Sequence, residues 1–365
     1  MKEQVVIVGA GLSGLRAASL LQSKGISCRV LEARSRLGGR VLSMAAKDRP
    51  ELGQFDLGPT WFWPNHESAI TKLVKDLGLP TIEQHISGSM LFEQSQTGQA
   101  QRHVLPKGAV ERSVRLAGGM QSLIDAIASS LPSGTVELNT RVNAIQLEEA
   151  DGVTIEAEQC DGIKRSFRGA AVILALPPRI LAERIAFEPR LPDGLIASLK
   201  DKPTWMAGQA KAIAIYDRPF WRDAGLSGQI TSWAGPLQEI HDASPDTGYG
   251  ALFGFFGLPA NMRQEIGEEH ILRLVTDQLT RLFGPPAGKP IALLYKDWAS
   301  DPETAVEEDA LPLTSFPDYG LPAGKSSWEK RVIFAATETA PGHGGHLEGA
   351  LQAAERAASE VMKVL

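Results

Sequence analysis

The sequence predicts an α/β fold with two domains, one built on a parallel sheet and a smaller one on a mixed sheet. The chain has 365 residues, more than one hydrophobic core usually serves, so two domains are expected. A strand, a glycine-rich turn, a helix and a second strand follow one another between Gln4 and Glu32, which is the pattern of a parallel βαβ unit. Further along, apolar strands alternate with short turns, as in a mixed sheet.

The other elements follow from apolar periodicity and from glycine and proline stops. Helices are predicted over residues 15–24, 66–77, 118–130, 268–283 and 349–365. Apolar strands are predicted over residues 4–8, 27–31, 171–176, 210–216, 251–256 and 332–335. The stretches 136–147 and 153–167, with Asp161-Gly162 as a turn, predict a β-meander.

The composition excludes several classes of protein. Hydrophobic residues make up 43% and charged residues 22% of the chain, which is typical of a globular protein. A net charge of −6 argues against a nucleic-acid partner. Cys28 and Cys160 form neither a disulfide framework nor a metal-ligand pair, so no metal is expected. Because the sequence shows no apolar run of membrane-spanning length and no secretory signal, we expect a cytoplasmic protein without a membrane partner.

The first strand ends in a G-x-G-x-x-G turn that predicts a dinucleotide site. The first glycine permits the tight turn, the second lets the backbone approach a diphosphate, and the third allows close packing of helix on strand. The acid that ends the second strand can accept hydrogen bonds from both ribose hydroxyls. This pattern alone does not distinguish NAD from FAD. The predicted cofactor-binding residues of the unit are Gly9, Gly11, Ser13, Gly14 and Glu32.

A loop rich in glycine and arginine follows the acid. Its two glycines expose backbone N–H groups, and a fixed guanidinium, that of Arg40, can neutralise phosphate charge. The sequence Glu-Ala-Arg-Ser-Arg-Leu-Gly-Gly-Arg at 32–40 resembles the second diphosphate loop of the FAD-dependent amine oxidase superfamily. The residues that this resemblance assigns to the cofactor are Ala33, Arg34, Gly38, Gly39 and Arg40.

Further segments extend the resemblance, in the family's order, over nearly the whole chain. They are Asp-Leu-Gly-Pro-Thr-Trp at 56–61, Gly-Gly-Met at 118–120, Thr-Arg-Val at 140–142, Ala-Leu-Pro-Pro at 175–178, Ala-Ala-Thr-Glu-Thr at 335–339 and Leu-Glu-Gly-Ala at 347–350. The chain is identified as a member of the flavin monoamine oxidase family, with Ala336 where relatives usually have glycine. The cofactor-binding residues that the resemblance adds are Gly58, Pro59, Thr60, Val142, Trp298, Glu338 and Leu347.

The resemblance implies a GR2-type FAD-binding Rossmann-like domain assembled from residues 1–77, 118–202 and 300–365. Residues 78–117 and 203–299 would form the smaller mixed-sheet substrate domain. A helix that begins near residues 345–349 would point its N–H groups at the flavin pyrimidine and stabilise the anionic reduced ring. The alternative is a glycine loop before an ordinary amphipathic helix.

Lys211 is the candidate catalytic residue. It lies in the strand Ala210–Tyr216, which resembles the family strand whose lysine holds a water near flavin N5. Ile213 and Ile215 share its face, so burial would lower its pKa and let it serve oxygen or proton steps. The alternative is a solvated lysine on an alternating strand. Trp298 resembles a tryptophan that lines the flavin, although a packed core tryptophan is an equal alternative.

Three departures from the family concern the cofactor linkage and the substrate pocket. Members with covalent flavin carry a cysteine near residues 310–317, which this chain lacks, so FAD is expected to be noncovalent. The family's helical insertion is reduced to residues 79–117, and His346 stands where relatives place a tyrosine beside the amine. With Trp61 as the other pocket residue, we expect a more open site that prefers bulkier or carboxylate-bearing amines. Alternatively, His346 only packs beside the ring, with backbone partners for its nitrogens.

The resemblance implies a FAD-dependent oxidoreductase that oxidises the C–N bond of an amine to an imine. Oxygen would reoxidise the flavin and give hydrogen peroxide, so a small-molecule amine and oxygen are the expected partners. Two alternatives share the nucleotide motifs: a C–C desaturase or protoporphyrinogen-oxidase-like flavoprotein, and a flavin-binding accessory protein without turnover. The strand context of Lys211 favours the amine oxidase over the desaturase.

Overall fold

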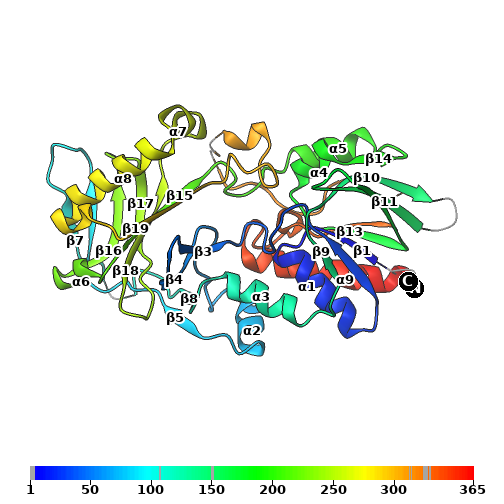
Figure 1. Cartoon of the computed structure of the whole chain (residues 1–365), viewed down its shortest axis with the longest axis horizontal. Helices are drawn as coiled ribbons and strands as arrows, with labels where there is room; N and C mark the ends of the chain where they lie inside the picture. Colours follow the sequence, from blue (N-terminus) through cyan, green and yellow to red (C-terminus); the bar gives the residue numbers. More distant parts are fainter. Residues whose placement is uncertain are drawn as a thin grey trace.

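The computed structural model describes residues 5–106, 108–148, 152–311, 313, 315–323, 328 and 330–365. The molecule is elongated, with a parallel sheet near one end and a large mixed sheet at the other (Figure 1). The predicted α/β class, with a Rossmann-like part and a second mixed sheet, is confirmed. Gln4, with which the first predicted strand begins, lies outside the described residues.

The parallel sheet has the strand order β20-β13-β1-β2-β9. Its strands come from distant parts of the chain: β1 (Val5–Val8), β2 (Cys28–Leu31), β9 (Val136–Glu137), β13 (Ala171–Leu174) and β20 (Val332–Phe334). All residues of β1 and β13 are buried. Burial on both faces explains why these strands are continuous β-branched and apolar runs rather than alternating ones.

Four helices share one apolar core with this sheet: α1 (Leu12–Ser23), α2 (Ser68–Asp76), α3 (Gln121–Ser129) and α9 (Leu347–Val364). The buried carboxylate of Glu348 on α9 accepts hydrogen bonds from the N–H groups of Ala69 at 3.0 Å and Ile70 at 2.9 Å. These N–H groups belong to the first turn of α2, where no intrahelical partner exists. The first turn of the terminal helix therefore caps another helix.

A four-stranded sheet shares a second core with β1 and β13. Its order is β12-β11-β10-β14, and its elements are β10 (Thr140–Glu148), β11 (Gly152–Gln159), β12 (Lys164–Gly169) and β14 (Ala186–Glu188), with α4 (Pro178–Arg184) and α5 (Asp193–Lys200) beside them. The prediction that residues 136–147 belong as a whole to the meander is wrong, because β9 joins the parallel sheet. The chain turns at Asn139, whose φ of +54° is the left-handed conformation that asparagine tolerates, and only the second half joins the meander.

The large mixed sheet has the order β19-β15-β18-β17-β16-β6-β7. It consists of β6 (Ser89–Glu93), β7 (Gln101–His103), β15 (Ala210–Tyr216), β16 (Leu226–Ser232), β17 (Leu237–Asp242), β18 (Gly250–Phe256) and β19 (Ala292–Asp297). α8 (Glu268–Phe283) packs on it and matches the predicted helix, with α6 (Phe220–Asp223), α7 (Ala260–Ile266) and η1 (Pro285–Gly288) nearby. All these strands lie within residues 78–117 and 203–299, although the domain boundaries themselves stay a prediction.

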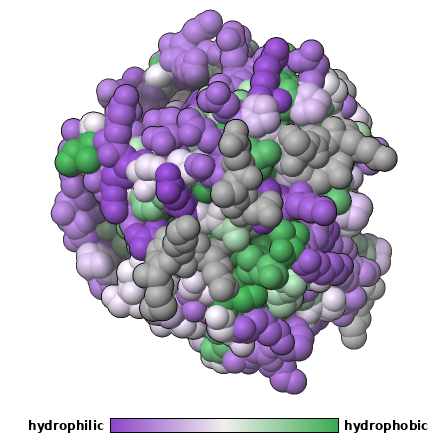
Figure 2. All heavy atoms as spheres, turned by 90° about the vertical axis from the view of Figure 1, so that its right-hand side faces the viewer, coloured by the Kyte–Doolittle hydropathy of each residue, from purple (hydrophilic) through white to green (hydrophobic). Residues whose placement is uncertain are grey.

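Two two-stranded sheets and two short 3-10 helices complete the described elements. They are β3 (Ser43–Ala46) with β4 (Arg49–Asp56), β5 (Thr81–Glu83) with β8 (Val114–Leu116), η2 (Glu307–Ala310) and η3 (Thr337–Thr339). Hydrophilic residues cover most of the end of the molecule seen in Figure 2, around one apolar patch. Within the described ranges, no helix is both long and apolar enough to cross a membrane.

Candidate cofactor and active site

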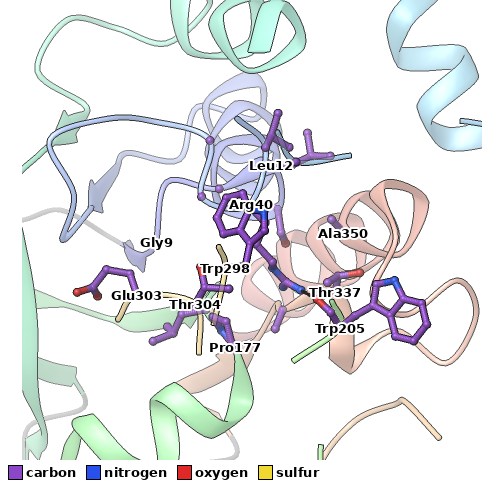
Figure 3. Close-up of a pocket in the computed structure, with 18 of the residues that line it drawn as sticks. Gly9, Leu12, Arg40, Pro177, Trp205, Trp298, Glu303, Thr304, Thr337 and Ala350 are labelled. Atoms are coloured by element: carbon purple, nitrogen blue, oxygen red, sulfur yellow. Dashed lines mark hydrogen bonds between the residues drawn. The ribbon is translucent and has the colours of Figure 1, made fainter. Parts of the chain in front are cut away.

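A cavity of about 570 Å³ brings most of the predicted site residues together. Figure 3 shows part of its wall, with Gly9 and Leu12 from the glycine turn and α1, Arg40 from the following loop, and Trp205 at the far end. The predicted residues that line it are Gly9, Gly11, Ser13, Glu32, Ala33, Arg34, Gly38, Gly39, Arg40, Gly58, Pro59, Thr60, Trp61, Val142, Lys211, Trp298, His346 and Leu347. The other two, Gly14 and Glu338, stand behind lining residues that they contact.

The glycine turn forms a cradle for an anionic group. Gly9 has a φ of +102°, and a Cβ atom on Gly14 would lie 1.9 Å from the Gly9 carbonyl oxygen, so both positions require glycine. The helix α1 begins after Gly11, and no described side chain caps it. The N–H groups of its first turn are thus left for a ligand, and the positive end of the helix dipole favours a negative one. The residues present fit a dinucleotide diphosphate.

Glu32 links the two segments that form this cradle. It is 4% exposed, and its two carboxylate oxygens accept hydrogen bonds from the N–H groups of Ala10 at 2.7 Å and Arg34 at 2.9 Å. The acid thereby ties the glycine turn to the loop that follows β2. Its remaining acceptor capacity is available to ribose hydroxyls, as the sequence predicts.

The arginines of the second loop are bound to other parts of the protein. Arg34 donates to the Asp301 carboxylate and to the Thr304 hydroxyl. Arg40 makes two hydrogen bonds, of 2.6 and 3.0 Å, with the fully buried carboxylate of Glu338. Burial alone would lower the pKa of Arg40, but Glu338 outweighs it and raises that pKa. The guanidinium predicted to neutralise phosphate is therefore part of a neutral pair at the cavity wall.

Lys211 is buried at the middle of the cavity wall, with 1% of its surface exposed. Its Nζ donates hydrogen bonds to the Gly58 carbonyl at 3.1 Å and to the Thr60 hydroxyl, and lies 4.0 Å from the centre of the Phe253 ring. Burial lowers its pKa from 10.5 to about 7, against the opposing effect of Asp56. The alternative of a solvated lysine is wrong.

Aromatic rings surround the end of the cavity that lies away from the glycine turn. The Trp61 ring centre lies 5.0 Å from that of His241 and 6.3 Å from that of Trp63. His346 packs against the rings of Trp205 and Phe316, each 5.9 Å away, and its Nδ1 is 3.1 Å from the Gly344 carbonyl. His346 therefore both packs against aromatic rings and lines the cavity.

Two acids at this end escaped the sequence analysis. Glu67 is 4% exposed and accepts a hydrogen bond from the Trp63 N–H at 2.8 Å, and a carboxylate oxygen of Glu239 lies 2.6 Å from His241 Nε2. Burial raises the pKa of Glu67, although the Trp63 N–H and His346 act in the opposite direction. One acid precedes a helix and the other lies in an alternating strand, where solvated acids are common. No sequence signal separates these two from such residues.

The fold and the cavity define a protein of the dinucleotide-binding class, because a G-x-G-x-x-G turn opens at the carboxyl edge of a parallel sheet. The pattern of an NAD(P)-binding Rossmann-like domain matches residues 7–77. The pattern of the family described as flavin containing amine oxidoreductase matches residues 86–362. The chain belongs to this family of flavin-dependent amine-oxidising enzymes, which confirms the family expected from the sequence.

Individual relatives match over almost the whole chain. Putrescine oxidase of Kocuria rosea is 26% identical over 481 aligned positions, which cover 99% of this chain and 95% of that protein. Flavin-containing amine oxidase B of Bos taurus is 25% identical over 465 positions, covering 100% and 87%. Both alignments exceed the length of this chain, so they contain gaps where it is shorter. The structure of cyclohexylamine oxidase from Brevibacterium oxydans shares the fold, with a TM-score of 0.82, 20% identity and coverage of 100% and 99%.

In the part of the chain that the structure describes, no group of three or more His, Cys, Asp or Glu side chains is placed to hold a metal ion.

The burial of Lys211 predicts a pH-dependent stability. The unfolded chain has a lysine pKa of 10.5 and the folded protein one of about 7, so between these values the unfolded state binds more protons and stability rises with pH. Lys211→Met removes this contribution. Its stability relative to wild type should therefore be greatest near pH 6 and fall by pH 9, measured by urea unfolding.

The matched control is Lys72→Met, because the Lys72 side chain is 75% exposed. It should give the same difference from wild type at both pH values. A pH-independent difference for Lys211→Met would contradict the lowered pKa.

Proposed function

We propose that this protein binds FAD noncovalently and oxidises the C–N bond of a cationic amine to an imine. The observation that carries the proposal is the buried Lys211, which lies where the glycine cradle and the aromatic, acidic end of the cavity meet. Bound FAD would supply the acceptor for the hydride equivalent of the amine and would pass the electrons to oxygen, giving hydrogen peroxide.

The cofactor would be held mainly by backbone groups. The N–H groups at the start of α1 suit the diphosphate, Glu32 suits the ribose, and the backbone at Val142 suits the adenine. The N-terminus of α9, at Leu347, lies at the cavity and would stabilise negative charge on the reduced ring. The absence of cysteine near residues 310–317 supports a noncovalent link.

Lys211 would supply one ordered donor at the reacting centre. Its Nζ is anchored by Gly58 and Thr60, so its remaining hydrogen can point to a water or to oxygen. With a pKa of about 7 it exchanges a proton readily near neutral pH. Its buried position also favours an amine oxidase over a desaturase.

The acids at the aromatic end support a cationic substrate. Glu67 and Glu239 place negative charge at the cavity wall, which attracts an ammonium group and repels a carboxylate. Trp61 and its neighbours exclude water and offer flat apolar surfaces. We therefore expect a bulky amine as the substrate, as the sequence predicts. Unlike the sequence-based expectation, however, the substrate should carry no carboxylate group.

Acid precipitation should release all flavin from the purified protein into the supernatant, because no cysteine is available near residues 310–317. Absorbance of the supernatant and the pellet measures this directly. Flavin that stays with the denatured pellet would show a covalent link and contradict the proposal.

Lys211→Met should keep the strand packed and the flavin bound but slow the reoxidation of reduced flavin by oxygen. Loss of an ordered donor at a reacting centre costs on the order of 10²-fold in rate. Stopped-flow absorbance after anaerobic reduction measures this step apart from amine oxidation. An unchanged rate of flavin reoxidation, with flavin still bound, would contradict the role proposed for Lys211.

Phenethylamine should reduce the bound flavin under anaerobic conditions on the order of tenfold faster than phenylalanine, which differs only by its carboxylate. Glu67→Gln should narrow this ratio, since it removes the negative charge that disfavours the carboxylate. Glu111→Gln is the matched control, because Glu111 is partly exposed and pairs with the neighbouring His66. Equal rates for the two compounds would contradict the assigned substrate class, and failure of all amines would contradict the function.

A further inference from the structure

The segment 301–309, which we call the strap, crosses the nucleotide end of the cavity. Two of its residues, Glu303 and Thr304, line the cavity together with Glu32 and Val142. Figure 3 shows these two strap residues at the end of the cavity where Gly9 and Pro177 lie, and Trp205 at the other end. The strap is therefore part of the wall that would face the adenosine half of a dinucleotide.

Between residues 301 and 306 the strap belongs to no helix or sheet. Its first part forms a local turn, in which Asp301 accepts hydrogen bonds from the N–H groups of Glu303, Thr304 and Ala305 at 3.0 to 3.1 Å, and its last residues begin the short helix η2. Its position over the cavity must therefore come from contacts with the rest of the protein.

The first of these contacts is a charged cluster around Asp301. One carboxylate oxygen accepts a hydrogen bond from Arg34, and the other accepts one from the Lys296 Nζ at 2.8 Å. Burial alone would raise the pKa of Asp301, but Arg34 and Lys296 hold it below its usual value. Asp301 is 8% exposed, so the contact is a largely buried ionic one. The same Arg34 also donates to Thr304 at 2.9 Å.

The second group of contacts comes from α4 and β10. Arg184 donates to the carbonyls of Pro302 and, at 3.4 Å, Ala305, while Arg141 forms an ion pair with Glu303. These bonds hold the central residues of the strap from the side of the nucleotide-binding segments.

The third contact anchors the far end of the strap. Asp309 is 5% exposed, and its carboxylate accepts hydrogen bonds from Arg179 at 2.7 Å and from the Thr204 N–H at 3.0 Å. Arg34, Arg141, Arg179 and Arg184 thus bind the strap at three separate points, and all four lie outside the large mixed sheet.

We propose that the strap retains the adenosine half of bound FAD, and that FAD leaves only when these arginine contacts open. Arg34 is then a positioning residue whose side chain acts through Asp301 rather than through the phosphates. This inference rests on the proposed function only in requiring FAD as the cofactor. It needs no statement about the amine or the oxidant.

The decisive variant is Asp301→Asn, because Asp301 does not line the cavity and cannot act by direct contact with the cofactor. It weakens the ionic contact with Arg34 and keeps the shape of the side chain. We expect flavin release from the purified holoenzyme, followed by the rise in flavin fluorescence after dilution, to become on the order of tenfold faster.

Glu137→Gln is the matched control. Glu137 is 16% exposed and pairs with Arg29 and Arg165 within the same half of the protein, away from the strap. A second, milder test is the cycle of Arg141→Gln, Glu303→Gln and the double variant. Each single change should speed release by on the order of fivefold, and the double variant by no more than either single change.

Two results would contradict the proposed role of the strap and leave the proposed function intact. One is flavin release from Asp301→Asn at the wild-type rate, and the other is equally accelerated release from Glu137→Gln. If Asp301→Asn does not fold, additive effects of Arg141→Gln and Glu303→Gln on the rate of flavin release would contradict the proposed role of the strap instead. A protein that takes up no FAD would overturn both proposals. Flavin that binds and is released faster only in the strap variants, while no amine reduces it, would support the strap and refute the function.

Discussion

The ion pair between the partly exposed Arg40 and the fully buried Glu338 is the interaction on which the cavity depends. It joins residues from opposite ends of the chain, and Glu338 also accepts the Trp205 N–H at 3.3 Å, so three distant segments meet at one carboxylate. Removing the Glu338 charge from water costs several kcal/mol, which the two-pronged geometry and the added N–H bond must offset. Loss of Arg40 would leave an uncompensated buried charge, which typically costs about 3–5 kcal/mol. The pair therefore fixes the loop and the C-terminal motif relative to each other.

A consequence is that the diphosphate would find few free cations at its site. Arg34 is bound by Asp301, Arg40 by Glu338, and Arg36 donates to three carbonyls of its own loop, at Leu37, Gly39 and Val41. The arginines of this loop therefore hold its backbone in place through bonds to other protein groups, and the backbone N–H groups stay accessible to a ligand. The negative charge would then be met by N–H groups and by the dipole of α1, which are fixed before the cofactor arrives.

The elements that the sequence predicts well are those whose signal is local. The helix Glu268–Phe283 has glycines on both sides and an apolar stripe, and the structure places both ends where those glycines indicate. Residues 136–147 were predicted wrongly because both halves are suited to strands, and only tertiary pairing shows that they belong to different sheets. The contacts of Arg40 and Arg34 lie 298 and 267 residues away along the chain. Sequence periodicity carries no information about contacts over such separations, so the carboxylate partners of these two arginines could not be predicted, and their roles toward the cofactor stay predictions.

The cavity carries charged groups along its whole length. The N-terminus of α1, Glu32 and Glu303 lie at the nucleotide end, Glu67 and Glu239 lie at the aromatic end, and Lys211 is also part of the wall. An ammonium group is drawn to the acids, whereas a charged Lys211 would repel it. As pH rises through about 7, Lys211 loses its proton, and the repulsion disappears in the range where amines also begin to shed protons. Hydride loss from carbon requires the neutral amine. The donor role proposed for Lys211 needs its third hydrogen and thus the protonated form, whereas oxidation needs the neutral amine, so the two requirements oppose each other as pH rises.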